Sequence, residues 1–151
     1  MKMAGFIPIM GRATHNLDSK NRIFIPAKHR EALGTNFVIF PNIKDRRSLV
    51  ISSVEYLEEL MRKIKESPKL TGKEKAQMIN YLNGNGDTLT PDAQGRVVIG
   101  ASLVAFAGLG GPTVIDGCFD HAEIWPESVF VGTTPEQAEF FAQRYEEADL
   151  I

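Results

Sequence analysis

Two stretches of the chain follow one pattern, and they decide its fold. They read Asp18-Ser-Lys-Asn-Arg22-Ile-Phe-Ile25 and Asp92-Ala-Gln-Gly-Arg96-Val-Val-Ile99, 74 residues apart. The match continues at the same offset in three further pairs: Ala27 with Ala101, Gly34 with Gly108, and Tyr56 with Phe130. Self-similarity of this kind indicates that one structural module is used twice in the chain.

The order of elements predicted for each module is strand, turn, strand, short helix, strand and strand. The apolar runs of both modules are short, rich in β-branched and aromatic residues, and bounded by glycine and proline, which favours strands. Short helices are expected at residues 27–33 and 101–109. The large aromatic residues of the runs are expected in the core: Phe24, Phe37, Phe40 and Trp125. The sequence therefore predicts an α+β fold that is mainly β.

Longer helices are predicted between the modules and after the second one. Ser52-x-x-Glu55 is the start signal of a helix that Pro68 ends, and Thr71-x-x-Glu74 opens another that ends near Asn83. Thr134-Pro135-x-Gln137 opens a C-terminal helix, with proline at its first position. The limits that follow are 11–60 for the first module, 61–86 for a helical linker, 87–133 for the second module, and 134–151 for the C-terminal helix and tail.

The repeated motif has the composition of a tight turn between two strands. Asp18 and Asp92 occupy its first position, where a carboxylate can accept hydrogen bonds from the backbone N–H groups that follow. The fourth residue, Asn21 or Gly95, is expected to have a positive φ, which glycine adopts freely and asparagine tolerates. Two similar turns are therefore expected to project from the sheet.

The side chains that these turns present are mostly cationic. Lys20 lies at the tip of the first turn, and Gln94 takes its place in the second. Arg22 and Arg96 stand where each turn enters the next strand. Rigid loops with long cations suit contacts with DNA phosphates and the recognition of guanine by two hydrogen bonds. The alternative, from the motif alone, is a surface hairpin whose Asp and Arg pair with each other.

Charge is distributed unevenly along the chain. The formal net charge of −2 does not favour a nucleic-acid partner. However, residues 1–75 hold 15 of the 17 Lys and Arg but 8 of the 19 Asp and Glu, so they carry +7 and the remainder carries −9. Such asymmetry suggests one part that faces a polyanion and one acidic part. The basic residues from Arg62 to Lys75 can also be read as a solvated helix face.

Other features point away from membranes, disulfides and metals. The single cysteine, Cys118, excludes an intramolecular disulfide, and no apolar run is long enough to span a bilayer, so a cytoplasmic protein is expected. Cys118 and His121 have the spacing of half a metal site, but His15 and His29 lie far away in the sequence. We therefore predict no metal, no cofactor and no small-molecule substrate, and we expect Cys118 in the core.

An enzyme is the main alternative to a binding protein. Asp120, His121 and Glu123 are the residues that could form an acid–base site. They adjoin a predicted strand, in which alternation sends neighbouring side chains to opposite faces, and this argues against a joint site. No catalytic residue is therefore predicted.

Motifs from both halves occur together in one protein family. The stretch Gly11-Arg-Ala-Thr-His15-Asn-Leu-Asp18-Ser-Lys-Asn-Arg22-Ile-Phe-Ile-Pro26 comes first, Asp92–Arg96 supplies D-x-x-G-R, and Ala122-Glu-Ile-Trp125 follows. In this order and spacing they resemble the MraZ proteins, whose hallmarks are D-x-K-G-R, a following proline, and F-E-I-W. The chain departs from the hallmark at Asn21, where the family has glycine.

The resemblance implies a fold and a function. MraZ proteins contain two AbrB-like (SpoVT-AbrB) swapped-hairpin modules, so a pseudo-twofold barrel is expected. They form rings and bind repeated short boxes upstream of the division and cell-wall gene cluster. This implies a homo-oligomeric, nucleoid-associated, sequence-specific transcriptional regulator that also acts on its own promoter. An AbrB-like antitoxin is the alternative within the binding class, but such antitoxins usually carry one module.

The resemblance also assigns residues by position. Those expected at double-stranded DNA are Lys20, Arg22, Gln94 and Arg96. The turn chemistry described above assigns the turns themselves to Asp18, Asn21, Asp92 and Gly95.

Overall fold

The structure, a computed structural model, describes residues 5–45 and 47–151, and it contains the predicted order of elements twice. The first module consists of β1 (Arg12–Leu17), β2 (Arg22–Phe24), α1 (Ala27–Leu33), β3 (Phe37–Pro41) and β4 (Leu49–Ser52). The second consists of β5 (Asp87–Leu89), β6 (Arg96–Val98), α4 (Ala101–Ala107), β7 (Gly111–Gly117) and β8 (Ala122–Pro126). The repeat and the α+β class are therefore confirmed.

The strands of the two modules pair mainly with each other. The larger sheet has the order β1-β7-β8-β4-β3-β5, so β1 pairs with β7 of the other module and β5 pairs with β3. In addition, β2 and β6 form an antiparallel ribbon of their own. Each module thus supplies strands that complete the other.

A pseudo-twofold barrel was expected, but the described residues form no closed barrel. The six-stranded sheet is open, with β1 and β5 as its two edges, because the chain leaves this sheet at the turn after β1 and β2 then pairs with β6 instead. The swapped-hairpin description of the modules stays a prediction.

The core lies beneath the β2–β6 ribbon and takes side chains from both modules. Ile23 and Ile25 from the first module and Val97 and Ile99 from the second are at most 2% exposed. Burying a side chain of this size stabilises a fold by about 1.5–3 kcal/mol, so these residues anchor the segments that follow the two turns. Because the inward positions of β2 go to isoleucine, Phe24 points outward and is 43% exposed, contrary to the prediction.

The other predicted aromatic core residues behave differently from Phe24. Phe37 and Phe40 are buried as expected, whereas Trp125 is half-buried. Phe40 belongs to a second cluster, which joins the sheet to the linker helices. The core prediction is therefore confirmed for Phe37 and Phe40 on β3, whereas Trp125 on β8 is only partly buried.

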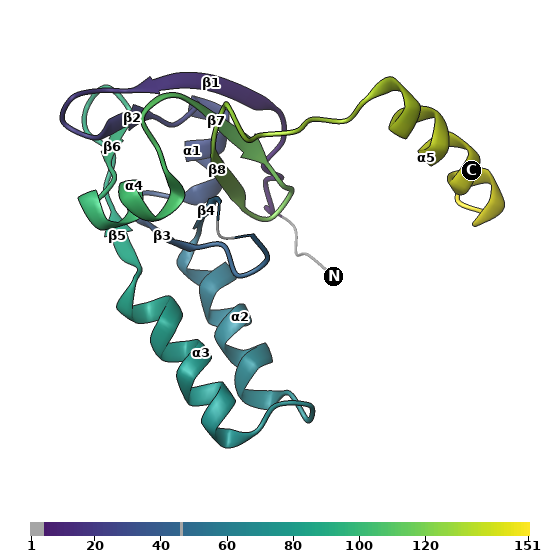
Figure 1. Cartoon of the computed structure of the whole chain (residues 1–151), viewed down its shortest axis with the longest axis horizontal. Helices are drawn as coiled ribbons and strands as arrows, with labels where there is room; N and C mark the ends of the chain where they lie inside the picture. The colour runs from purple at the N-terminus through teal and green to yellow at the C-terminus, as the bar shows by residue number, and fades with distance from the viewer. Residues whose placement is uncertain (1–4, 46) are drawn as a thin grey trace.

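The linker contains two helices, α2 (Val54–Glu66) and α3 (Gly72–Gly84), which form a hairpin extending from the sheet (Figure 1). The cap of α2 is Ser53, whose side chain accepts a hydrogen bond from Tyr56 N, and not Ser52, which belongs to β4. The capping box of α3, formed by Thr71 and Glu74, is confirmed. Because α2 continues past residue 60, the proposed limit between module and linker falls inside a helix.

The C-terminal helix α5 (Pro135–Glu147) has the predicted capping box, in which Thr134 and Gln137 exchange hydrogen bonds. It lies away from the rest of the molecule (Figure 1), and none of its residues is buried. Among the residues described, no helix is both long and apolar enough to pass through a membrane.

Candidate nucleic-acid interface

The first turn is organised around one carboxylate. Asp18 Oδ1 accepts hydrogen bonds from the backbone N–H groups of Lys20 and Arg22, both at 2.9 Å, and Asp18 Oδ2 accepts one from Arg22 Nε at 2.7 Å. The backbone of Asn21 donates to Asp18 O at 3.0 Å, and Asn21 has a φ of 58°. The hydrogen bond from the Arg22 backbone, above all, lowers the pKa of Asp18. The predicted turn is therefore present.

The second turn repeats these contacts atom for atom. Asp92 Oδ1 accepts from the backbone of Gln94 and Arg96, both at 2.9 Å, and Asp92 Oδ2 accepts from Arg96 Nε at 2.9 Å. Gly95 donates to Asp92 O at 2.9 Å and has a φ of 84°. The Arg96 backbone hydrogen bond is the first cause of a lowered pKa at Asp92. Local sequence thus determines the same turn at two places.

Backbone hydrogen bonds hold each turn against the other module. Ile25 N donates to Gly95 O at 3.1 Å, and Ile99 N donates to Asn21 O at 2.8 Å. Between these bonds the β2–β6 ribbon pairs Ile23 with Val97. The positive-φ residue of each turn therefore accepts a hydrogen bond from the strand exit of the other module, which fixes the two turns relative to each other.

The ribbon exposes one side, which we call its outer face: Arg22, Phe24, Arg96 and Val98. Arg22 is paired with Val98 and Phe24 with Arg96, while Ile23 and Val97 are buried on the other side. The two arginines are therefore diagonal neighbours on adjacent strands, a relation in which Cα atoms lie about 7–8 Å apart. Sequence reasoning missed the contribution of Phe24 and Val98, although strict alternation outward from Ile23 and Val97 is the signal that identifies them.

The ion pairs engage only part of each arginine. The side chains of Arg22 and Arg96 are 31% and 24% exposed, and each donates through Nε to its own aspartate. Within residues 5–45 and 47–151, no hydrogen bond involves the Nη atoms of either arginine. The Asp–Arg pairing of the alternative interpretation is thus present, and it orients the arginines while leaving their outer amino groups available.

The surroundings of the two turns differ. Lys20 is exposed at the first tip, where the second has Gln94. However, the guanidinium of Arg30 lies against Gly95, so that a Cβ placed there would be 2.7 Å from Arg30 Cζ. Arg30 Nε donates to Ile25 O at 3.0 Å, which holds this cation beside the second turn. The sequence did not reveal Arg30, because it reaches the turn from α1 of the other module.

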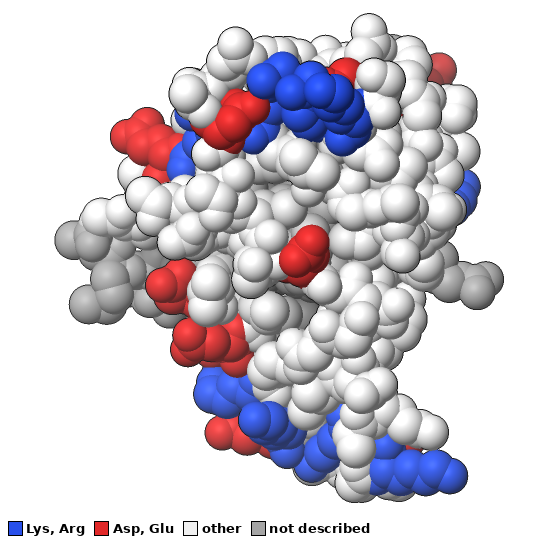
Figure 2. All heavy atoms as spheres, turned by 90° about the vertical axis from the view of Figure 1, so that its left-hand side faces the viewer, with Lys and Arg blue, Asp and Glu red and all other residues white. Residues whose placement is uncertain are grey.

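Basic side chains gather at two places on one face of the molecule. Figure 2 shows Lys and Arg at the top, on the side where Figure 1 places β2 and β6, with acidic atoms beside them. A second basic group lies at the lower end, on the side of α2 and α3. The upper group thus lies on the same side of the molecule as the β2–β6 ribbon.

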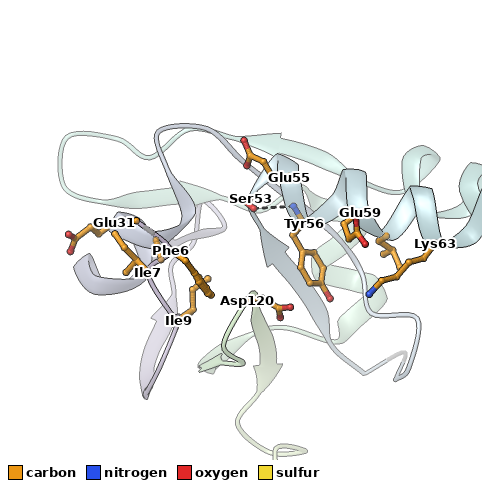
Figure 3. Close-up of a pocket in the computed structure, with 13 residues that line it drawn as sticks. Phe6, Ile7, Ile9, Glu31, Ser53, Glu55, Tyr56, Glu59, Lys63 and Asp120 are labelled. Atoms are coloured by element: carbon orange, nitrogen blue, oxygen red, sulfur yellow. Dashed lines mark hydrogen bonds between the residues drawn. The ribbon is translucent and has the colours of Figure 1, made fainter. Parts of the chain in front are cut away.

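A groove of about 1050 Å³ lies away from the turns, between the segment before β1, α1, α2 and the β7–β8 turn (Figure 3). Its charged side chains are mostly acidic: Glu31, Glu55, Glu59, Lys63 and Asp120. Negative charge of this kind repels phosphate, so the groove does not extend the candidate DNA interface.

The residues of the rejected catalytic alternative do converge beside this groove. His121 Nδ1 lies 2.9 Å from Asp120 Oδ1, and His121 Nε2 lies 3.4 Å from Glu123 Oε2. The expectation that these side chains point to opposite faces is wrong. Asp120 and His121 belong to the turn before β8, where strand alternation does not hold. His121 and Glu123 are two residues apart and therefore share a face. Cys118 joins them and is half-buried, outside the buried core clusters, so its predicted place in the core is also wrong.

The charge of His121 reflects this convergence. Burial disfavours the imidazolium, but hydrogen bonds with Cys118, Glu123 and Asp120 outweigh it and raise the pKa of His121 to about 10. Burial is the first cause of a raised pKa at Cys118. The four side chains thus form one coupled group.

Comparisons with known proteins give a consistent result. The family model "MraZ protein, putative antitoxin-like" matches twice, at residues 9–76 and 83–150. The transcriptional regulator MraZ of Thermobifida fusca is 30% identical over 138 residues, 91% of this chain and 94% of its own length. The proteins of the same name from Saccharopolyspora erythraea and Paenarthrobacter aurescens are 35% and 36% identical, over 89% and 77% of this chain and 93% and 79% of their own lengths.

Proposed function

The chain belongs to the MraZ family, and from this premise we propose that it is a transcriptional regulator that binds double-stranded DNA through its two turns and the outer face of the β2–β6 ribbon. The names of its relatives support regulation of transcription. The observation that carries the DNA contact is the pair of partly exposed arginines, each held at Nε by its own turn aspartate, with no hydrogen bond at its Nη atoms among the described residues.

The spacing of the outer face suits duplex DNA. Diagonal neighbours about 7–8 Å apart span about two base-pair steps, since each step rises about 3.4 Å. Arg22 and Arg96 then each recognise a guanine by two hydrogen bonds to O6 and N7. Phe24 and Val98, between them, supply the apolar contact that a thymine methyl group accepts.

The cations around the ribbon have a different role. Lys20, at the first tip, and Arg30, beside the second turn, flank the outer face and contact phosphates, which fixes the register of the protein on the duplex. Gln94 can donate a neutral hydrogen bond to the backbone at the position where Lys20 places a charge. Both turns thereby contribute to one interface.

The operator that we propose is a set of repeated short boxes upstream of the division and cell-wall gene cluster, including the promoter of the protein's own gene. This part rests on the family resemblance. A regulator that binds such an operator works in the cytoplasm, in association with the nucleoid.

We further propose that the protein forms a closed homo-oligomeric ring. The support is α5, which lies apart from the body and exposes Phe140, Phe141 and Tyr145 at 57%, 41% and 47%. An apolar helix face of this kind needs cover, and a second copy of the chain provides it by a head-to-tail contact, which generates rings when the rotation closes. Repetition of the two turns around a ring raises their effective concentration at repeated boxes.

The test is binding to DNA from upstream of the protein's own gene, measured by fluorescence anisotropy at several salt concentrations. The double variant Arg22→Ala/Arg96→Ala is expected to lose its preference for this DNA over a scrambled duplex. The matched control, Lys69→Ala/Lys73→Ala, removes two cations from the linker region and should keep the preference. Equal preference in the parent and the double variant would show that the outer face does not read DNA.

Assembly is tested separately by light scattering. The full chain should have a mass well above that of a dimer, and a chain ending at residue 133 should fall to a smaller species. A monomer of the full chain at micromolar concentration contradicts the ring, whatever the DNA result.

A further inference from the structure

We propose that Cys118, His121 and Glu123 form a zinc site at the β7–β8 turn, separate from the DNA interface. One potential ligand atom from each of these residues lies within 4.8 Å of the other two. Thiolate, imidazole and carboxylate are the three groups from which proteins build zinc sites. The fourth position of the tetrahedron goes to water, as in zinc sites that have three protein ligands.

The backbone brings the three ligands together within six residues. Cys118 N donates to His121 O at 2.8 Å, and Phe119 has a φ of 76°, so residues 118–121 form a tight turn with Cys118 and His121 at its two ends. Glu123 follows on β8, two residues after His121, and therefore projects from the same face as His121. No long-range movement is needed to assemble the site.

The distance between two of the ligand atoms also suits a shared metal ion. His121 Nε2 and Glu123 Oε2 are 3.4 Å apart, long for a charged pair in contact. Two N and O ligands at about 2.0–2.1 Å from a tetrahedral zinc ion are themselves about 3.3–3.4 Å apart. A zinc ion placed between these atoms therefore requires little adjustment.

The outer atoms of the same side chains are held by further hydrogen bonds. His121 Nδ1 faces Asp120 Oδ1 at 2.9 Å, which leaves Nε2 for the metal. Trp125 Nε1 donates to Glu123 Oε1 at 3.0 Å, which leaves Oε2. Metal-bound histidines almost always have such a carboxylate or carbonyl partner on the second nitrogen, where it fixes the ring and strengthens the ligand. Asp120 and Trp125 are thus positioning residues of the site.

The surroundings favour a cation and give it access. Asp116 lies beside the thiol, with Oδ2 3.7 Å from Cys118 Sγ, while its Oδ1 accepts a hydrogen bond from Arg12 Nε at 2.7 Å; Asp120 adds a second carboxylate beside His121. The ring of Tyr56 lies 5.0 Å from that of His121 and covers one side. Figure 3 shows Asp120 and Tyr56 on the wall of the acidic groove, through which an ion can reach the cluster from solvent.

The experiment uses the full chain, freed of any histidine tag and of bound metal, and titrates it with Zn²⁺ alone in a calorimeter. The parent is expected to bind one Zn²⁺ per chain with a micromolar or lower Kd. Cys118→Ser, at a half-buried position, should weaken binding more than about tenfold, and Asp120→Asn by about 10–100-fold. The matched control, His15→Gln, removes a histidine of β1 and should bind like the parent.

Cobalt replacement gives a second measurement that a purely structural role would not affect. Co²⁺ bound to the parent should show thiolate-to-cobalt charge transfer and the strong visible bands of tetrahedral coordination, and both should be absent in Cys118→Ser. The proposal is overturned if the parent binds no Zn²⁺ saturably, or if Cys118→Ser binds it as tightly as the parent. Zinc binding with a cobalt spectrum that lacks the thiolate band overturns the assignment of Cys118.

Discussion

The turns Asp18–Arg22 and Asp92–Arg96 have the same backbone and the same ion pair, but different electrostatic surroundings. In both, one aspartate accepts two backbone hydrogen bonds and holds an arginine through Nε. The first turn has an exposed lysine of its own at the tip, whereas the second has a glutamine and receives a cation, Arg30, from the other module. Local sequence therefore sets the shape of each turn, and tertiary packing sets its charge.

The largest expected effect separates the two arginines. Arg22→Ala should weaken binding to the operator by roughly 1–3 kcal/mol and relax the preference among boxes, since it removes a bidentate guanine contact. Arg96→Ala should act in the same direction, because Asp92 holds Arg96 as Asp18 holds Arg22 and Arg30 supplies a second cation beside this turn. Neither change should unfold the protein, because each removes one ion pair while the backbone hydrogen bonds to Asp18 and Asp92 remain. Operator affinity, with the melting temperature as control, measures both; parental affinity in both variants would reduce the turns to ordinary surface hairpins.

The next effect concerns the fourth residue of each turn. Gly95→Val should destabilise the protein by about 1–3 kcal/mol, because a β-branched residue resists a φ of 84° and because its Cβ would displace Arg30. Asn21→Gly should be neutral or mildly stabilising, since a φ of 58° suits glycine, whereas Asn21→Val should distort the first turn. Urea unfolding measures the free energy of unfolding of the three variants. Equal stability of Gly95→Val and the parent would contradict backbone strain at this position. Introducing Gly95→Val in an Arg30→Ala background shows how much of the destabilisation comes from the contact with Arg30.

A smaller effect tests whether the tips differ only in charge. Lys20→Gln should lower the affinity for all sequences evenly. It should also reduce the slope of log affinity against log salt concentration by about one unit, the contribution of one phosphate contact. Gln94→Lys should do the reverse and make the second turn resemble the first. The measurement is the dissociation constant of a specific and a random duplex across a salt series. A change in preference between the duplexes, without a change in slope, would assign Lys20 to a base rather than to a phosphate.

The smallest effect is the titration of the two turn aspartates. Hydrogen bonds from the following arginine backbone lower the pKa of Asp18 and Asp92 in the folded protein below 3.8. A lowered pKa means that the turn contacts are fully present above pH 3.8 and are lost as the pH falls through the folded pKa values. Carboxyl ¹³C NMR should show both residues titrating below exposed carboxylates. A normal value for one of them would mean that the two turns are not equivalent in solution.

Much of the fold could be predicted because it is locally encoded. The alternating apolar runs gave the strands of both modules, and the Asp-x-x-Asn/Gly pattern gave the positive φ at Asn21 and Gly95. The cap of α2 lies one residue after the predicted Ser52, because Ser52 and Ser53 are adjacent and only the hydrogen bond from Tyr56 N distinguishes them.

The rest depends on contacts between distant segments. Strand exchange between the modules, the position of Arg30 over Gly95, and the open sheet follow from packing that no short pattern describes. The prediction that Asp120, His121 and Glu123 do not form a joint group fails for a different reason. Strand alternation does not hold for Asp120 and His121, because both precede β8, and the tight turn from Cys118 to His121 brings these side chains toward Glu123.

The exchange of strands has a consequence for the synthesis of the chain on the ribosome. β1 pairs with β7, and Arg12 meets Asp116, 104 residues later. At about 5–20 residues per second, the first strand leaves the ribosome about 5–20 s before its partner exists. An edge left open for that time invites aggregation, and polar or charged side chains protect it. β1 reads Arg-Ala-Thr-His-Asn-Leu, the composition of a strand that can remain unpaired in water until its partner is made.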